Sequence, residues 1–390
     1  NKGVAPEGFE DERWIAINAP LAHRVGAEPQ DTLIVRVEIP GALSKDAPLS
    51  GESEQATPFS AVVTTVLDAE QFGLYSLKAE QVPPATIFLR CERLEAILEQ
   101  PGRANLLLGD HSLDAAAFAA AAERVWDLED LQLQVTATDA GTTRQMVSSR
   151  VFFDSAIIEA LQKIASVSSP VLTYLATDIA AGEKATPYSM VTGVGPALND
   201  IVVDDLPDDQ IVLSQWLADD LGVGAGDAVT LVYNVVGTGR ALEEESRSFR
   251  VAGIKPIGQA GWDQSWTPDF PGIFDVDGLD DWEPGIPIDR DRIRDKDDEY
   301  WDQYKATPKA FVSLAAARSM WANRFGDATA VRFQTREPDT PLVEQLRGNL
   351  QLTDLGMAYR DLPAEARSAV ADSFDFGALF ASMSFFLIVA

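Results

Sequence analysis

Two stretches of this chain carry one pattern: LAHRVGAEPQDTL at residues 21–33 and LADDLGVGAGDAV at residues 217–229. Leu, Ala, Gly and Asp recur at a single offset, 227 − 31 = 196. In each stretch a short apolar-faced segment ends at a glycine, Gly26 or Gly222. Glycine adopts the left-handed conformation that closes a helix, so each stretch is predicted to contain a short helix that ends there.

A turn follows each predicted helix and leads into a strand. The turns carry Asp31 and Asp227, and the apolar runs after them span residues 32–37 and 228–234. Turn residues followed by an apolar, β-branched run are typical of a strand start. The sequence therefore predicts a duplicated helix-turn-strand unit, and its structural motif consists of Gly26, Asp31, Gly222 and Asp227.

The two copies match again further along the chain, where Asp354 corresponds to Asp130 and the offset is 354 − 130 = 224. The difference between the two offsets, 224 − 196 = 28, is a net insertion in the second copy, which we place around residues 255–305. The matched pairs are strands at 87–90 and 310–313, helices at 94–98 and 314–321, strands at 104–108 and 329–333, helices at 114–126 and 341–347, and the segments 128–131 and 352–355 with a strand after each.

A further segment, residues 150–195, precedes the second copy. It is predicted to form a strand at 150–153, a helix at 155–165 and strands at 171–177 and 186–194. The counterpart of this segment in the first copy would fall ahead of residue 1. We therefore expect one such β-α-β unit ahead of the first copy. Two copies this far apart indicate a domain duplication and exclude a solenoid.

The composition limits the class of protein. The 390 residues suffice for two or three domains, and 61 acidic against 31 basic residues give a net charge of −30. This charge argues against a nucleic-acid or anionic-lipid surface. Only nine of the basic residues are Lys, and an acidic, lysine-poor composition fits a salty medium. The single cysteine, Cys91, excludes an internal disulfide, and we expect it to be a small buried residue.

The chain ends in FGALFASMSFFLIVA at 376–390, a run that contains no charge. A membrane span needs roughly 18 or more apolar residues, so this run is predicted to be the start of a transmembrane helix. A C-terminal core helix is the alternative. The connector at 362–375 carries Pro363 and acidic residues, which suit a polar approach to a membrane surface.

Several stretches together resemble one family, the extracytoplasmic domains of FtsX-like and MacB-like permeases of ABC transporters. The resemblance covers most of the chain and rests on ordinary residues rather than on a catalytic motif. The similar stretches are SRVFFD at 149–154, residues 170–179, YSMV at 188–191, residues 211–231, ATPKAFVSL at 306–314, and residues 376–390.

The resemblance implies an α+β, mixed α/β fold with porter-like β-α-β units and small barrel-like subdomains, here internally duplicated. On this basis residues 1–112 form a first barrel-like repeat and 113–200 a membrane-proximal porter-like segment. A second barrel-like repeat spans 201–335 with the acidic and aromatic insertion at 255–305, a returning helix and strand span 336–373, and the transmembrane helix begins at 374–390.

The resemblance also implies partners and a location. The domain would lie on the periplasmic or extracellular side of the inner (plasma) membrane, anchored by flanking membrane helices. A separate cytoplasmic ATPase subunit would drive the permease, and an extracytoplasmic protein or lipoprotein would be a further partner. The chain has no phosphate-binding GxxxxGK[ST] motif, so no cofactor is expected on it.

Residues suited to catalysis are few. His23 lies in the first repeated helix and is predicted to face solvent, while Ser112, beside His111, is better explained as a helix cap. Adjacent residues do not make a nucleophilic triad, which separate segments assemble. An Asp-rich turn at 275–278 lacks EF-hand spacing and leaves only a non-EF calcium site open. We therefore assign no catalytic or metal-binding residue.

The insertion is rich in aromatic residues and in acids, with thirteen Asp or Glu from Asp269 to Asp302. Rings at these positions either pin a long insertion onto the domain or form a partner or ligand surface. The candidate interaction surface consists of Trp262, Trp266, Phe270, Trp282, Tyr300 and Trp301.

The sequence thus favours a non-catalytic extracytoplasmic permease domain that couples cytoplasmic ATP hydrolysis to transport or mechanical work outside the membrane. Two alternatives from other classes stay open. One is a secreted acidic hydrolase that uses Asp/Glu pairs, and the other is a sugar- or peptide-binding module built on the aromatic insertion.

Overall fold

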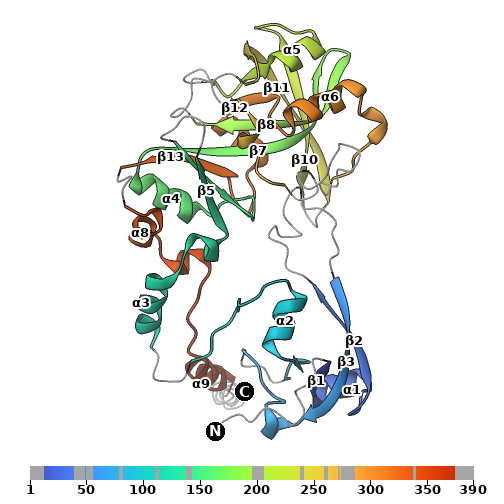
Figure 1. The fold of residues 1–390 in the computed structure, drawn as a ribbon, viewed down its shortest axis with the longest axis vertical. Helices are drawn as coiled ribbons and strands as arrows, with labels where there is room; N and C mark the ends of the chain where they lie inside the picture. Colours follow the sequence, from blue (N-terminus) through green and yellow to red (C-terminus); the bar gives the residue numbers. More distant parts are fainter. Residues whose placement is uncertain are drawn as a thin grey trace, which may run out of the picture. The chain divides into compact units, whose positions relative to one another are not determined.

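The computed structural model describes residues 13–38, 49, 56–78, 82–109, 114–137, 143–195, 206–237, 241–258, 262–270, 273, 286–336 and 340–373. The chain divides into two compact units. Unit 1 comprises Asn1–Pro40, Glu54–Phe118 and Ala358–Ala390, and unit 2 comprises Gly41–Ser53 and Ala119–Met357. Both combine helices with β-sheet, so the α+β class holds (Figure 1).

Unit 1 is built around a four-stranded sheet in the order β2-β3-β1-β4. Strand β1 pairs in parallel with β3 and antiparallel with β4, and β2 pairs antiparallel with β3. Its elements are β1 (Trp14–Asn18), α1 (Ala19–Val25), β2 (Thr32–Glu38), β3 (Ala56–Leu67), η1 (Ala69–Gln71), β4 (Ile87–Phe88), α2 (Cys91–Ile97), α9 (Leu362–Ser373) and the start of α3 (Ala115–Val125).

Unit 2 contains the same four-strand arrangement within a larger sheet. Strands β10-β11-β9-β12 follow the order of β2-β3-β1-β4, with the same parallel and antiparallel pairs. The elements are β9 (Gln210–Ser214), α5 (Gln215–Leu221), β10 (Ala228–Val236), β11 (Leu242–Lys255), β12 (Ala310–Ser313) and α7 (Leu314–Trp321).

A hairpin of β7 (Ala165–Ala181) and β8 (Lys184–Val194) completes this part of unit 2. Strand β8 pairs in parallel with β12, and β7 pairs antiparallel with β10. The pairings therefore close a ring of six strands. One buried cluster draws residues from all six strands and from α5 and α7, with Leu172, Val191, Ile211, Leu231, Val251 and Val312 among its members.

The long strand β7 also enters a second part of the sheet. Beyond the ring, its first residues pair with β13 (Ala330–Thr335), which continues to β6 (Arg144–Ser148) and β5 (Leu133–Ala137). Helices α4 (Ser155–Ile164) and α8 (Leu342–Arg347) pack against this part through a separate core that includes Phe153, Leu161 and Leu346. The η2 turn (Leu128–Leu131) precedes β5, and η7 (Leu352–Leu355) follows α8.

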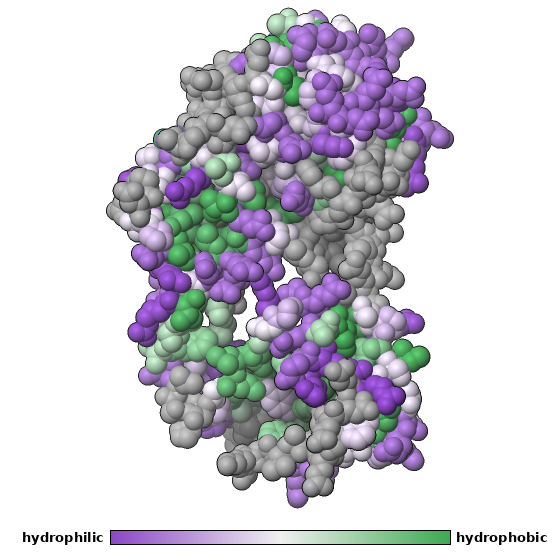
Figure 2. Space-filling model, in the orientation of Figure 1, coloured by the Kyte–Doolittle hydropathy of each residue, from purple (hydrophilic) through white to green (hydrophobic). Residues whose placement is uncertain are grey.

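The insertion between β11 and β12 contributes η4 (Gln264–Trp266), η6 (Arg290–Arg292) and α6 (Asp295–Tyr304) among the described residues. Helix α6 is acidic in its first turn, where negative side chains stabilise a helix by interacting with the positive end of its dipole. Figure 2 shows hydrophilic residues over α5 and α6 on the face that it draws, in keeping with the acidic composition.

Several local predictions are corrected by the structure. Residues 104–108 form no strand, because without a sheet neighbour an apolar run has no ladder partner. Residues 150–153 form a turn, and the strand lies earlier, at β6. Helix α9, rather than a strand, follows η7. Cys91 is exposed, because it begins α2, a helix with no buried residue.

No helix among the described residues is long and apolar enough to cross a membrane. The apolar run at 376–390 lies outside the described residues, so the predicted transmembrane start stays a prediction.

Candidate functional site

The repeat motif has the same geometry in both units. Gly26 and Gly222 end α1 and α5 with φ of 67° and 69°, the left-handed region that favours glycine. Asp31 and Asp227 each accept a backbone hydrogen bond at 2.8 Å from the residue three positions earlier. These four residues shape turns and point to no ligand.

Buried aromatic rings hold the insertion onto unit 2. Trp262, Trp266 and Phe270 are at most 1% exposed, and Tyr300 and Trp301 are at most 5% exposed. Trp262 donates from Nε1 to the Pro308 carbonyl at 2.7 Å, a bond that ties the insertion to the segment just before β12. The structure thus places these five rings in cores rather than on an exposed surface, while Trp282 lies outside the described residues.

Arg332 on β13 is part of this packing. Its guanidinium carbon lies 3.2 Å from the centroid of the Trp266 ring, and Nε donates to Gln145 at 2.7 Å. Nη2 donates to the Ser265 hydroxyl at 2.8 Å. Burial lowers the pKa of Arg332 to about 10, so the group stays charged at neutral pH. Gln145 of β6 in turn donates from Nε2 to the Ser265 carbonyl at 2.7 Å. The cation-π contact and these two hydrogen bonds to Ser265 fix the insertion to the sheet.

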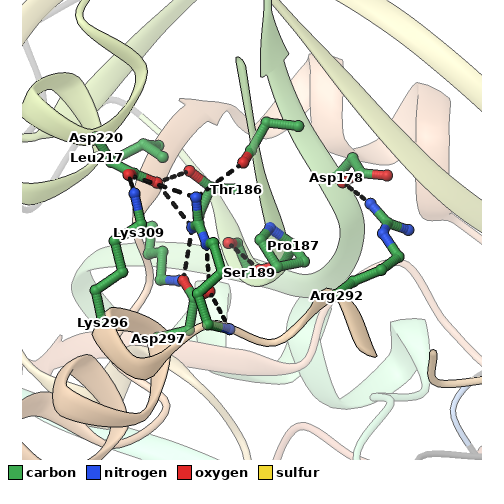
Figure 3. A network of polar contacts seen from close by, with 12 residues as sticks. Asp178, Thr186, Pro187, Ser189, Leu217, Asp220, Arg292, Lys296, Asp297 and Lys309 are labelled. Carbon is green, nitrogen blue, oxygen red and sulfur yellow. Dashed lines mark hydrogen bonds and ion pairs between the residues drawn. The ribbon is translucent and has the colours of Figure 1, made fainter. Parts of the chain in front are cut away.

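Among the residues that the structure describes, a cluster of ionised groups lies where the insertion meets α5 and β8 (Figure 3). Arg294, the N-cap residue of α6, donates from Nη2 to Asp220 of α5 at 2.8 Å and from Nε to Asp297 of α6 at 2.7 Å. Both carboxylates have side chains that are only 3% exposed. Thr186 of β8 and Lys296 also contact Asp220. Arg294 therefore bridges two buried carboxylates on separate elements.

Lys309, directly before β12, lies next to Asp297, one of the two bridged carboxylates. Its Nζ is 3.8 Å from Asp297 Oδ1 and 4.5 and 4.6 Å from the ring centroids of Trp216 and Tyr300. Burial lowers the pKa of Lys309 to about 7, and the nearby Arg294 and Lys296 add to the lowering, while Asp297 opposes it. The ammonium thus occupies an aromatic cage with one carboxylate near it.

A second ion pair fastens the insertion to β7. Arg292 contacts Asp178 of β7, and its guanidinium carbon lies 5.7 Å from the centroid of the Tyr188 ring. The Tyr188 hydroxyl accepts a hydrogen bond from the backbone N–H of Asp289 at 2.7 Å. Figure 3 shows this contact on the far side of Pro187 and Ser189 of β8 from Asp220 and Asp297. The two clusters together hold the insertion along the β7–β8 hairpin.

A cavity of about 20 Å³ borders the bridge, enough for one water molecule. Tyr188, Met190, Asp297, Trp301 and Lys309 are among its lining residues. A pocket of this size does not admit a sugar or a peptide. Both carboxylates of the network are engaged by Arg294, so neither is free to act as an acid or a nucleophile. The arrangement is suited to fixing elements rather than to chemistry on a substrate.

The other sequence candidates do not join this network. His23 is exposed on α1, as predicted, and His111, Ser112 and the turn at 275–278 lie outside the described residues. Within the part of the chain that the structure describes, no three His, Cys, Asp or Glu side chains are placed to hold a metal ion.

Sequence reasoning missed Asp220, Arg294 and Lys309. Asp220 lies in the second repeated helix, where the repeat pattern gives no reason to expect a buried carboxylate. The available signal was Lys309 in TPKAFVSL at 307–314, where a lysine directly precedes an apolar strand. A lysine that is buried in this way needs a partner. The identity of that partner, Asp297 on α6, depends on the folding of the insertion.

Comparison with known proteins gives likenesses of fold only. No protein-family model matches the chain, and no curated protein matches it in sequence. The periplasmic region of MacB from Actinobacillus actinomycetemcomitans is similar at 11% identity with a TM-score of 0.29, over 54% of this chain and 86% of that chain. A domain of a putative permease from Porphyromonas gingivalis is similar at 10% identity with a TM-score of 0.25, over 50% and 69% of the two chains.

Proposed function

We propose that this chain is a non-catalytic extracytoplasmic domain of an ABC transporter permease. The observation that carries the proposal is where the family-like stretches fall. Residues 170–179, 188–191, 211–231 and 306–314 contribute to β7, β8, β9-α5-β10 and β12, and these strands are joined in one nine-stranded sheet. The resemblance therefore concerns one connected structural unit and not scattered fragments.

The build of β7 supports a role in transmitting motion. This single strand of 17 residues, roughly 55 Å long at about 3.3 Å per residue, belongs both to the six-stranded ring and to the β13-β6-β5 part of the sheet. The strand continues from one part into the other, with irregularities in its pairing near Asp178 and near Thr335, and so ties the two parts together. Force applied at one end of unit 2 would therefore move the whole unit.

The proposed partners and location follow from the resemblance to FtsX-like and MacB-like permeases. A cytoplasmic ATPase subunit would supply the motion through membrane helices that flank the domain, with the domain outside the inner membrane. An extracytoplasmic protein or lipoprotein would receive the motion. The boundaries inferred from the sequence, with a porter-like part at 113–200 and 336–373, belong to the same proposal.

The geometry disfavours the two alternatives. A hydrolase needs carboxylates that face a substrate cleft, whereas Asp220 and Asp297 are bridged by Arg294. A binding module based on the insertion needs exposed rings, whereas the five described rings are buried.

The proposal is tested by determining on which side of the membrane unit 2 lies. An epitope inserted at the exposed β7–β8 turn, beside Glu183, should leave the sheet intact and be detected by antibody on intact cells that make the full-length protein. An epitope that antibody reaches only after lysis would refute the proposed location.

A further inference from the structure

The shared four-strand arrangement has different surroundings in the two units. In unit 2, β8 covers the free edge of β12 and β7 covers the free edge of β10, and the ring is closed. In unit 1, the matching strands β4 and β2 are the outer strands of the sheet, and neither has a second strand neighbour among the described residues.

The match between the two arrangements extends to single backbone hydrogen bonds. Asn18 N–H donates to Thr86 at 3.1 Å, and Ser214 N–H donates to Lys309 at 2.9 Å. Likewise Val63 N–H donates to Asp31 and Val251 N–H to Asp227, at 2.9 and 2.8 Å. Each unit 1 position therefore has a defined counterpart in unit 2. The first helices agree too, because the side chains of Asn18 and Ser214 each accept from the backbone N–H three residues on.

Burial differs at these matched positions. Leu33 and Val35 of β2 are only partly buried, whereas their counterparts Val229 and Leu231 of β10 are 1% and 0% exposed. The same difference separates four further matched pairs, in which the unit 1 member is partly buried and the unit 2 member at most 2% exposed: Leu21 and Leu217, Ala22 and Ala218, Ile87 and Ala310, Leu89 and Val312. On the two central strands the matched residues are buried in both units, as Ile15 and Ile211 or Val63 and Val251 show. Unit 1 thus presents apolar side chains that its own described residues leave half covered.

We propose that β2 and β4 of unit 1 receive a two-stranded β-hairpin that closes a six-stranded ring, as β7–β8 does in unit 2. One strand of the hairpin runs parallel to β4 and the other antiparallel to β2. Its inward side chains are apolar and cover Leu33, Val35 and Ile87. Main-chain hydrogen bonds along the open edges of β2 and β4 fix the direction of each hairpin strand. Burial of Leu33, Val35 and Ile87 supplies much of the free energy of docking.

The occupant is a segment of the same polypeptide that lies ahead of β1, since β7–β8 lies ahead of β9 in unit 2. A strand donated by a second copy fits less well. It would pair with one edge only, and the ring would stay open because β2 and β4 lie on opposite sides of the sheet. This inference rests on the internal match and does not depend on the proposed function.

Amide hydrogen exchange tests the proposal. A protein of residues 1–390 is compared with the same protein extended at its N-terminus by its natural sequence. The extension has the length of the segment from the start of α4 to the start of β9. The extension is expected to slow exchange in β2 at least tenfold and to leave β10, whose edges are already paired, unchanged. Equal exchange in the two proteins overturns the proposal, as does a natural sequence without two strand-length apolar stretches there. Slowing that grows with protein concentration assigns the edges to a second copy and also overturns it.

Two neighbouring residues on β2 give a matched pair of variants. Leu33 faces the core, whereas Ile34 is 74% exposed on the opposite face. In the extended chain, Leu33→Ser should remove most of the tenfold slowing, and Ile34→Ser should retain it. Equal effects of the two variants overturn the assignment of the inward face. Circular dichroism of both variants verifies that unit 1 keeps its fold, and the comparison without substitutions decides the matter if either variant unfolds.

Discussion

Lys309 is a charge held in an apolar setting. Its ammonium lies among Trp216, Tyr300 and the carboxylate of Asp297, and burial brings its pKa down to about 7 from an ordinary value of 10.5. A buried lysine that loses its proton this easily makes the folded state sensitive to pH near neutrality.

The pH dependence of stability should therefore change in Lys309→Met. Between pH 7 and 10.5 the unfolded state binds more protons at this lysine than the folded state does, so the free energy of unfolding rises with pH. Urea unfolding at pH 7 and pH 9 should show the wild type gaining up to about 1.4 kcal/mol per pH unit more than the variant. Identical pH dependence in the two proteins would show that Lys309 titrates normally.

Arg294 is the bridge on which two buried carboxylates depend. Arg294→Gln leaves Asp220 and Asp297 without their shared partner, and breaking a buried ion pair costs about 3–5 kcal/mol. Lys296→Gln is the matched control, because Lys296 contacts the same Asp220 with a side chain that is 45% exposed and should cost less than about 1 kcal/mol. Chemical denaturation measures both, and equal losses would mean that the bridge does not hold the insertion.

Buried rings attach the insertion to the rest of unit 2. Trp262 is fully buried, packs edge-on against Phe311 at 4.5 Å and bonds to the Pro308 carbonyl. Trp262→Ala should cost about 3–5 kcal/mol, whereas Trp262→Phe keeps a ring and should lose about 1–2 kcal/mol. Thermal unfolding measures the difference, and a small effect of the alanine variant would place the insertion outside the cooperative core.

Local sequence patterns predict several of the helices and strands. The glycines and aspartates of the repeat predict α1, β2, α5 and β10, because turn geometry is a local property. The prediction at 104–108 is wrong because an apolar stretch becomes a strand only where a sheet edge accepts it. The bridge joins Asp220 to Arg294, which are far apart in the chain, and no spacing rule relates them. The sequence shows that the insertion is rich in aromatic residues. Whether these rings anchor the insertion or form an exposed interaction surface depends on tertiary packing.

The whole molecule carries a net charge of −30, and self-repulsion of this size opposes compactness. The Debye length falls from about 10 Å at 0.1 M salt to about 3 Å at 1 M, so repulsion between surface carboxylates should weaken. The melting temperature should rise between 0.1 M and 2 M KCl. A flat or falling melting temperature would show that surface charge does not limit stability.

Under the proposed function both units lie outside the membrane. Unit 2 is tested by the epitope, and unit 1 carries a natural probe, the exposed Cys91, which is the single cysteine of these residues. The hydrogen bond to Glu95 raises the pKa of its thiol, so labelling is run at pH 8.5 to increase the thiolate fraction.

Cys91 can be labelled with a membrane-impermeant maleimide on intact cells that make the full-length protein. We expect labelling before lysis that is lost in Cys91→Ser, a variant that also controls for cysteines elsewhere in the full-length chain. Labelling of Cys91 that appears only after lysis would refute an extracytoplasmic location of unit 1.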